Sequence, residues 1–395
     1  MKQFKILIAL FLLIINVHAQ NYDEAKVPAY TLPDVLKTSD NISVTNKSLW
    51  EKVRRPEILT LFENNIYGQM PKTYDSIQFS ITNEEADAMK GKCRLKEVQI
   101  KVFKNGTSVK IDLILFIPNN LKGKAPAFLL INNRDKNNTD ARRTTKSGFW
   151  PADMVIDSGY AIAAFHVSDV APDNKDSFQN GALQLYPEQL NADNGMKAIG
   201  AWAWGASRVL DYLIKDRDID AEKIAVVGHS RGGKAALWAA AEDQRFAICF
   251  SNCSGNSGAA LARRRVGETI SRINEHFPWW FCNNYKKYND NEATLPVDQH
   301  MLISLIAPRP VYTTNASQDL WADPKGSYLS LINGAKVFSL YGIQVPLTPA
   351  PPPINSPIIK SPLGYHIREG IHDMTAYDWA QFIKFANYHY KKNLK

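Results

Sequence analysis

Cysteine is scarce in this sequence of 395 residues, and no cysteine stands at a spacing from histidine that is typical of a zinc site. The sequence therefore predicts no bound metal, and no motif in it indicates another cofactor. The cysteines are Cys93, Cys249, Cys253 and Cys282. They allow three complete disulfide pairings, among which we favour Cys253 with Cys282. Free buried thiols are an equal alternative in a chain with a large core.

Long apolar runs are missing beyond the N-terminus, so no later segment is expected to cross a membrane. The apolar run from Ile6 to Val17 is short for a membrane span and follows two lysines. It leads to small residues that suit a cleavage site after Ala19. We interpret residues 1–19 as a signal peptide and residues 20–395 as a single domain that is periplasmic or secreted. A permanent membrane anchor is the alternative interpretation.

The sequence also lacks a concentrated basic region, although Lys and Arg outnumber Asp and Glu by 47 to 39. The longest basic cluster runs from Arg263 to Arg265, and no basic stripe with interleaved aromatic residues surrounds it. This pattern argues against nucleic-acid binding. Internal repeats are absent as well, which argues against a propeller domain that would gate a serine peptidase. We expect a monomer.

The pattern of apolar residues changes along the chain in a way that indicates the fold class. Alternating stretches at Ser76 to Thr82, Arg94 to Phe103 and Val109 to Ile117 are typical of antiparallel strands. From the continuous apolar run Ala127 to Asn132 onward, strands alternate with helices, which predicts a parallel sheet wrapped by helices. This order is typical of the α/β-hydrolase fold, a three-layer sandwich around a mostly parallel central sheet.

The remaining elements and two interruptions complete the expected organisation. Later strands are expected at Tyr160 to His166, Ile224 to Val227, Phe246 to Ser251 and Arg309 to Asn315, and helices at Trp50 to Asn65, Asp193 to Lys215, Lys325 to Leu331 and Ala376 to Tyr390. Residues 255–305 form an insertion rich in aromatic and charged residues. Residues 345–362 are rich in proline, which excludes a helix or a central strand there. Segments of this length are usually functional or disordered.

A Gly-x-Ser-x-Gly pentad follows the strand Ile224 to Val227 and leads into a helix-forming stretch. Strand, sharp turn and helix are the context of a nucleophile elbow, which makes Ser230 our candidate nucleophile. Gly228 and Gly232 leave space for the strand-to-helix crossing. The alternative is a tight turn whose serine only caps the helix. We expect the backbone N–H of Arg231 to stabilise an oxyanion, with its guanidinium as a second donor.

A serine nucleophile needs a base, and the base needs an acid that orients it. Our first choice of base is His372, which lies in a loop just before the last helix, where the fold places its catalytic histidine. His366 is the second choice. The acid is expected at Asp319, after a late strand. Asp323 is the near alternative, although a proline follows it and a helix cap is the simpler interpretation.

Motifs beyond the pentad resemble those of the glucuronoyl esterases, carbohydrate esterase family fifteen. Residues Gly228 to Lys234 have the Gly-x-Ser-Arg-x-Gly-Lys pattern of that family's elbow. Further matches follow in chain order at Ser254 to Ala260, Gly267 to Thr269, Phe277 to Phe281, Leu295 to His300, Ala307 to Pro310, Asp319 to Pro324, His372 and Asp378-Trp379. The resemblance covers most of the chain from about Trp50 on and is most specific from residue 224 to 379.

The resemblance implies a serine carboxylesterase that hydrolyses the ester between 4-O-methyl-glucuronic acid of glucuronoxylan and lignin alcohols. It implies Ser230 as nucleophile, His372 as base and Arg231 as oxyanion stabiliser. Three residues match positions that contact the uronate sugar, namely Lys234, Glu268 and Trp321. The alternatives for these three are a solvated helix lysine, a glutamate paired with the arginine cluster, and a core tryptophan.

The acid is the one departure from the family pattern. Many members place a Glu just before Ser-Gly, on the loop after the strand that follows the elbow helix, whereas this chain has Cys253 there. A thiol with the usual pKa of about 8.5 cannot replace a carboxylate at neutral pH. The acid is therefore expected to be Asp319, as in bacterial relatives that use the later strand. Two other functions stay open, another carbohydrate ester hydrolase such as an acetyl-xylan esterase, and a non-catalytic carbohydrate-binding relative.

Overall fold

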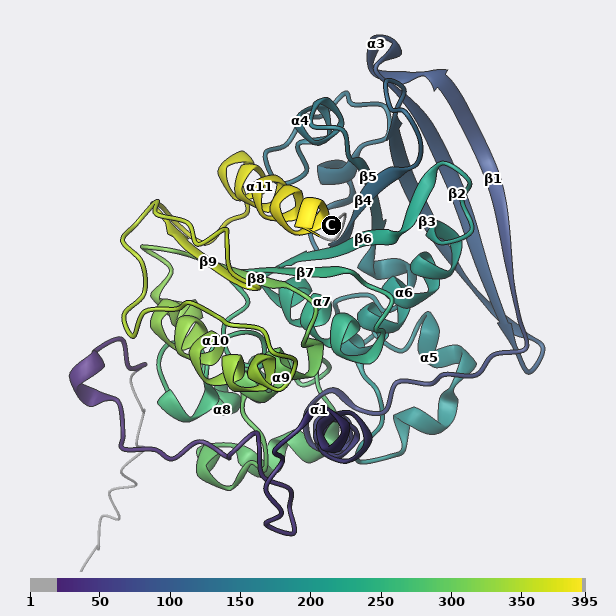
Figure 1. Cartoon of the computed structure of the whole chain (residues 1–395). Coiled ribbons are helices and arrows are strands. Elements are labelled where there is room, and N and C mark those ends of the chain that lie inside the picture. Colours follow the sequence, from purple (N-terminus) through teal and green to yellow (C-terminus); the bar gives the residue numbers. More distant parts are fainter. Residues whose placement is uncertain (1–19, 393–395) are drawn as a thin grey trace, which may run out of the picture.

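The computed structural model describes residues 20–392, so the predicted signal peptide lies outside the described residues. Within that range one sheet of nine strands has the order β1-β2-β3-β5-β4-β6-β7-β8-β9 (Figure 1). The strands are β1 (Ser76–Asp87), β2 (Cys93–Lys104), β3 (Thr107–Pro118), β4 (Ala125–Asn132), β5 (Ala161–His166), β6 (Ile219–His229), β7 (Ile248–Asn252), β8 (Val311–Ala316) and β9 (Leu363–Arg368). The pairs β1–β2, β2–β3 and β3–β5 are antiparallel, and the other pairs are parallel. The predicted fold class is confirmed.

Helices cover both faces of the sheet. They are α1 (Lys47–Leu49), α2 (Arg55–Phe62), α3 (Ala88–Gly91), α4 (Ala152–Asp157), α5 (Ala182–Leu185), α6 (Ala198–Leu213), α7 (Arg231–Glu242), α8 (Ile270–His276), α9 (Gln299–Ile306), α10 (Pro324–Ser339) and α11 (Ala376–Lys392). In Figure 1, α4 and α11 lie on one face, whereas α6, α7, α9 and α10 lie on the other. None of the helices in residues 20–392 combines the length and the apolar character that a membrane span requires.

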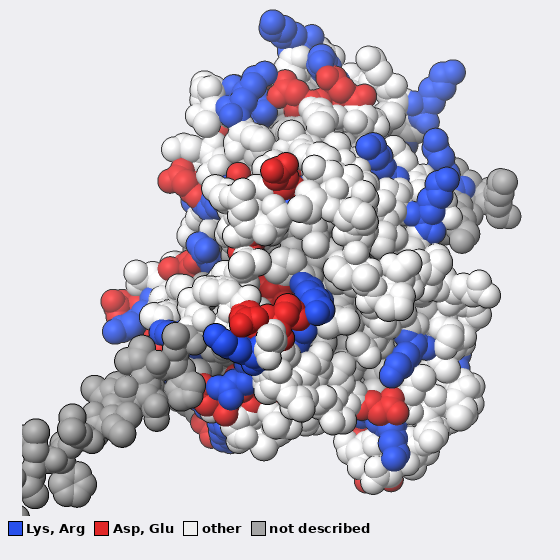
Figure 2. Space-filling view, turned by 90° about the vertical axis from the view of Figure 1, so that its left-hand side faces the viewer, with Lys and Arg blue, Asp and Glu red and all other residues white. Residues whose placement is uncertain are grey.

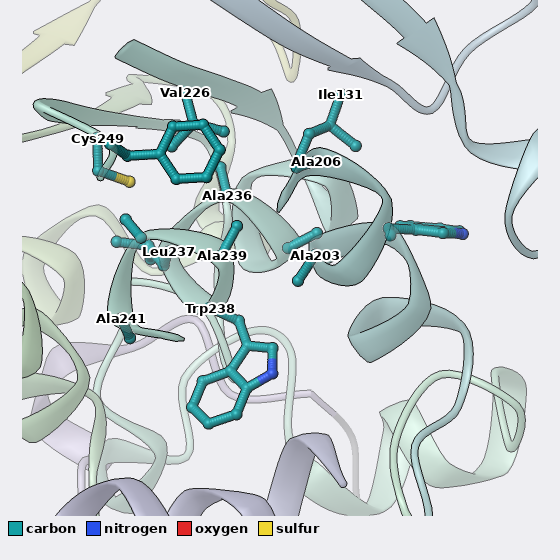
Figure 3. Packing of buried hydrophobic residues seen from close by; sticks show 14 of the residues in the cluster. Ile131, Ala203, Ala206, Val226, Ala236, Leu237, Trp238, Ala239, Ala241 and Cys249 are labelled. Atoms are coloured by element: carbon teal, nitrogen blue, oxygen red, sulfur yellow. The ribbon is translucent and has the colours of Figure 1, made fainter. Parts of the chain in front are cut away.

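The two faces of β4 show why the sequence has a continuous apolar run there. Phe128 and Leu130 pack into the core cluster beneath α4 and α11, and Leu129 and Ile131 pack into the cluster that faces α6 and α7. Because successive side chains of a strand point to opposite faces, a strand covered on both sides needs apolar residues at every position. Figure 3 shows alanines of α6 and α7 in the second cluster, beneath Val226 of β6.

The last strand and the ends of several elements were not anticipated. β9 follows the proline-rich segment and contains Gly364 and the polar His366, so it does not stand out as an apolar run. A Cβ at Gly364 would lie 2.1 Å from the ring of Tyr312, which explains the glycine in a buried strand. The helix expected at Asp193 begins only at Ala198. The insertion 255–305 holds α8, α9 and short 3-10 turns.

The cysteines differ from the pairing that the sequence favoured. Cys93, Cys249, Cys253 and Cys282 are all buried and free, so the Cys253–Cys282 pairing is wrong and the alternative of free thiols is confirmed. The arginines of the cluster pair individually with carboxylates, Arg263 with Asp298, Arg264 with Asp323 and Arg265 with Asp290. Figure 2 shows basic and acidic residues in small mixed groups on one face of the molecule.

Candidate active site

Ser230 stands at a sharp turn between the end of β6 and the start of α7. Its backbone has φ 54° and ψ −127°, a conformation that a non-glycine residue rarely adopts. The Ser230 N–H donates to the carbonyl of Asn252 at the end of β7, over 2.8 Å. A Cβ at Gly228 would lie 2.0 Å from the Gly232 carbonyl oxygen, so the crossing excludes any side chain at Gly228. This is the local geometry of a nucleophile elbow.

His372 and Asp319 form a hydrogen-bonded pair beside this turn. His372 Nδ1 lies 2.6 Å from Asp319 Oδ2, and the Asp319 side chain is buried whereas that of His372 is 38% exposed. Asp319 follows β8, and His372 follows β9. The His372 ring lies 4.7 Å, between centroids, from the ring of His229, the residue just before Ser230. Among the described residues, no hydrogen bond joins Ser230 Oγ to His372 in this state of the protein.

The second-choice residues are occupied elsewhere. Asp323 caps α10 by accepting from the Gly326 N–H over 2.8 Å, and it pairs with Arg264. His366 is buried in β9, where Nδ1 lies 2.9 Å from the Tyr312 hydroxyl and Nε2 lies 2.9 Å from Asp378. Neither side chain is free to serve the elbow, which leaves His372 and Asp319 as the pair brought to Ser230.

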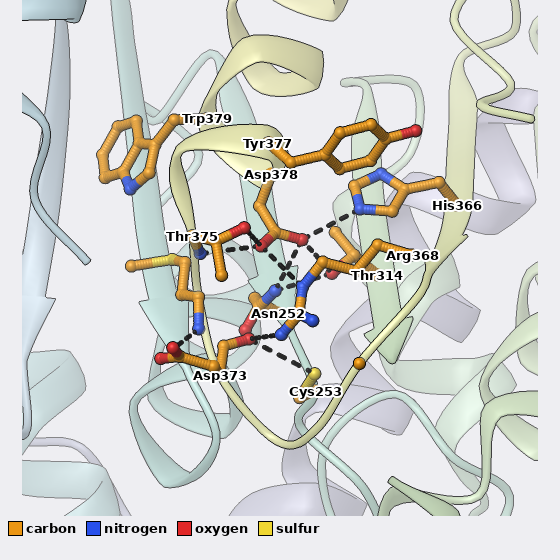
Figure 4. Close-up of polar contacts among 12 residues, drawn as sticks. Asn252, Cys253, Thr314, His366, Arg368, Asp373, Thr375, Tyr377, Asp378 and Trp379 are labelled. Carbon is orange, nitrogen blue, oxygen red and sulfur yellow. Dashed lines mark hydrogen bonds and ion pairs between the residues drawn. The ribbon is translucent and has the colours of Figure 1, made fainter. Parts of the chain in front are cut away.

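A buried polar network is centred on Asp378 (Figure 4). Its carboxylate lies 3.0 Å from Arg368 Nε and accepts from the Thr375 N–H over 2.8 Å. Burial alone would raise the pKa of Asp378, but its bond to His366 and the charge of Arg368 hold that pKa below its usual value. Arg368 in turn donates to the carbonyl of Asp373, over 2.7 Å. The network thereby ties both ends of the short loop that carries His372 to the sheet.

Arg231, the first residue of α7, is held by a residue that the sequence analysis did not single out. Its guanidinium forms an ion pair with Asp173, in the loop after β5, and donates to the Asn133 carbonyl over 3.2 Å. Asp173 also accepts from the indole N–H groups of Trp279 and Trp280, at 2.9 and 2.7 Å. No local motif marks Asp173, because its partners come from distant parts of the chain. The aromatic insertion and the elbow therefore share one carboxylate.

Lys234 and Glu268 form a buried ion pair close to Ser230. Lys234 Nζ lies 2.6 Å from Glu268 Oε2, and it donates to the carbonyls of Ser254, over 2.8 Å, and of Asn256. Burial lowers the pKa of Lys234 and raises that of Glu268, and their mutual attraction partly offsets both shifts. The alternatives of a solvated lysine and of a glutamate paired with the arginine cluster are therefore wrong.

The backbone of Trp321 contacts the Lys234–Glu268 pair. Its carbonyl accepts from the N–H of Glu268 over 2.9 Å, and its side chain is partly exposed, so it is not a core tryptophan. The short turn Leu320–Ala322 follows Asp319 directly. One loop thus carries both the carboxylate that holds His372 and an indole at the surface.

Comparisons with known proteins point to one family of enzymes. A family model described as "Glucuronyl esterase, fungi" matches residues 100–342. The protein named carbohydrate esterase MZ0003, from an unknown prokaryotic organism, is 39% identical over 95% of this chain and 94% of its own. The 4-O-methyl-glucuronoyl methylesterase 1 of Wolfiporia cocos is 25% identical over 80% of this chain and 74% of its own.

Solved structures give the same result. A glucuronoyl esterase from Solibacter usitatus superposes with a TM-score of 0.86 at 36% identity, covering 93% of this chain and 100% of its own. A structure described as a promiscuous CE15 esterase from a marine bacterial metagenome has a TM-score of 0.86 at 38% identity, with coverages of 94% and 100%. The resemblance read from the motifs is confirmed, and the chain belongs to the glucuronoyl esterases of carbohydrate esterase family 15.

Proposed function

We propose that this chain hydrolyses the ester between (4-O-methyl-)glucuronic acid of glucuronoxylan and lignin alcohols, with Ser230 as nucleophile. Ser230 Oγ attacks the ester carbonyl while His372 Nε2 takes the hydroxyl proton. Asp319 keeps the other ring proton on Nδ1 and stabilises the imidazolium. The tetrahedral intermediate expels the alcohol, to which His372 returns the proton, and a water molecule then hydrolyses the acyl-enzyme by the same steps.

Arg231 stabilises the oxyanion of both tetrahedral intermediates. As the first residue of α7, Arg231 has a backbone N–H without a carbonyl partner inside the helix, which is the donor that the nucleophile elbow uses. Its guanidinium adds a positive charge that Asp173 and the Asn133 carbonyl hold in one place. Donors that are already oriented lower the barrier without reorganising during the reaction.

The observation that carries the proposal is the buried Lys234–Glu268 pair one helical turn from Ser230. Glu268 uses Oε2 for Lys234, and within residues 20–392 no group donates to its Oε1, which leaves an acceptor for a sugar hydroxyl. Trp321, held to Glu268 through the backbone, supplies a flat apolar surface for a pyranose ring. The open acceptor of Glu268 and the aromatic surface of Trp321 support a polar sugar acid ester as the substrate, and Lys234, whose three N–H groups all bind within the protein, holds Glu268 in place.

Comparing hydrolysis of benzyl glucuronate with that of an acetylated xylose tests this proposal. We expect kcat/KM for the glucuronate ester to exceed that for the acetyl ester by about 100-fold or more, equal to about 2.7 kcal/mol of transition-state binding. Ser230→Ala should remove both activities. A serine-directed phosphonate should label Ser230, and the absence of an adduct would instead favour a non-catalytic carbohydrate-binding protein.

A broader carbohydrate esterase is the second candidate, because a relative at 38% identity is described as promiscuous. Similar kcat/KM values for glucuronate, acetyl and simple aryl esters would favour it. Glu268→Gln separates the two functions: it should raise KM for the glucuronate ester and leave acetyl ester hydrolysis unchanged if Glu268 recognises the sugar.

We also propose that residues 1–19 act as a cleaved signal peptide that exports the protein. Export with cleavage after Ala19 would bring the enzyme to polymeric xylan outside the cytoplasm. N-terminal sequencing of the protein recovered from the periplasm or medium of an expressing bacterium should begin at Gln20. Recovery of a chain that retains Met1 in the membrane fraction would contradict cleavage and favour an anchor.

A further inference from the structure

Three donor groups of different chemistry converge at the candidate active site. The Sγ of Cys253, a carboxylate oxygen of Asp319 and a ring nitrogen of His372 all lie within 4.8 Å of one another. They come from the segments after β7, β8 and β9, which are neighbours in the sheet. Cys253 and Asp319 are buried, whereas the His372 side chain is 38% exposed and lies toward solvent.

We propose that these three side chains form an inhibitory site for Zn²⁺. Thiolate, imidazole and carboxylate are the donors that zinc prefers, and Ca²⁺ or Mg²⁺ would require more oxygen ligands than the cluster offers. Zinc bonds of about 2.0–2.3 Å place tetrahedral ligands roughly 3.3–3.8 Å apart, so the distance of 2.6 Å between His372 Nδ1 and Asp319 Oδ2 must lengthen to admit the metal, while Cys253 Sγ is already within 4.8 Å of the other two donors. His372 lies on a partly exposed loop and can supply this movement, and the fourth position remains for water.

Zinc binding releases one proton, from the thiol of Cys253, and moves another within the imidazole ring of His372. The Cys253 thiol is buried beside Asp319 and must lose its proton when it binds the metal. Zn²⁺ displaces that proton to solvent and forms the Zn–S bond. When Nδ1 of His372 gives its lone pair to the metal, the ring proton of the neutral imidazole moves to Nε2.

The change of tautomer explains the inhibition, which rests on the proposed function. A His372 ring that carries its proton on Nε2 can no longer accept the proton of Ser230 Oγ. Asp319 becomes a metal ligand and no longer orients the base. Zinc would therefore stop the first step without blocking the sugar-binding residues.

Cysteine variants with a matched control test the site by activity. Zinc at micromolar concentration should reduce wild-type ester hydrolysis at least 10-fold, and a chelator should restore it. Each variant is compared with its own metal-free rate. Cys253→Ala should need at least 10-fold more zinc for half-inhibition, whereas Cys282→Ala, a buried thiol whose Sγ lies 3.9 Å from the Asn64 carbonyl, should behave as wild type. Equal zinc sensitivity in Cys253→Ala would overturn the proposal.

Cobalt binding provides a readout that does not depend on catalysis. The full chain and its Ser230→Ala variant should both show thiolate-to-Co²⁺ charge-transfer absorption at one equivalent of metal, and Cys253→Ala should lose it. No such band in the wild type, or an equal band in Cys253→Ala, would refute the metal site. A band in a protein without esterase activity would instead refute the proposed function and leave the metal site standing.

Discussion

Arg231 and Asp173 form an ion pair that joins the first residue of the elbow helix to the loop after β5. The same carboxylate holds the indoles of Trp279 and Trp280, so a single side chain fixes the guanidinium relative to the aromatic insertion. A cation that is free to rotate stabilises a developing oxyanion less well than one held in place.

Asp173→Ala should lower kcat for the glucuronate ester by about 10- to 100-fold, with a smaller change in KM, because the guanidinium loses its orientation. Steady-state kinetics measure both parameters. Asp173→Asn keeps an acceptor for the indoles but loses the charge, and its kcat should fall between wild type and Asp173→Ala. Asp176→Ala changes an exposed residue of the same loop and should behave as wild type. Unchanged kcat in Asp173→Ala would show that Arg231 does not need this partner.

Asp319→Ala should reduce kcat by about 1,000-fold or more, because His372 then loses the group that fixes its tautomer. Asp323→Ala is the matched comparison: it should keep most of the activity and lower the free energy of unfolding by about 2 kcal/mol or more, since Asp323 caps α10 and pairs with the buried Arg264. Kinetics and thermal unfolding of both variants distinguish the roles. The reverse result would identify Asp323 as the acid.

Lys234→Met should destabilise the protein by about 3–5 kcal/mol, because it leaves the Glu268 carboxylate buried without its partner. Lys234→Met combined with Glu268→Leu should recover most of this stability and still lack activity on the glucuronate ester. Denaturant unfolding and kinetics on the same three proteins check this. Recovery of activity in the double variant would mean that the ion pair serves only the fold.

Glu242→Gln should change how stability depends on pH. Burial and the neighbouring Glu63 raise the pKa of Glu242 from 4.5 to about 8. A protonated Glu242 favours the folded state. Its full contribution to the free energy of unfolding is present below pH 4.5 and is lost as the pH rises to about 8. Glu242→Gln should therefore raise Tm by a few degrees at pH 8 relative to wild type, with little difference at pH 5. Glu222→Gln, at an exposed position, should change Tm equally little at both values.

The sequence predicted the parts of the fold and site that depend on local patterns. The strand before Ser230, the glycines of the elbow and the apolar run of β4 each reflect one segment's own geometry, and the structure has all of them. Asp319 and His372 were placed by their position after late strands, and they lie in hydrogen-bond contact. Their catalytic roles remain predictions.

What the sequence missed depends on contacts between distant segments. Asp173 is one of several acidic residues in a polar loop, and only the folded chain brings Trp280 and Arg231 to it. β9 was missed because its glycine and its polar residues are explained only by contacts with distant segments. Gly364 packs against the ring of Tyr312, and His366 binds Asp378. Cys253 was linked to Cys282 on export alone, whereas the fold buries the two thiols at different sites.

Residues that follow β7 and β8 both lie near the imidazole of His372, and this has a consequence for how the family can evolve. Cys253 lies at the position where the resemblance to the family leads us to expect glutamate, and its Sγ is within 4.8 Å of a donor atom of Asp319 and of His372. A carboxylate after either strand could therefore orient the same histidine. A chain that carries both carboxylates would stay active when one of them is lost by mutation. Transfer of the acid from one strand to the other requires no inactive ancestor.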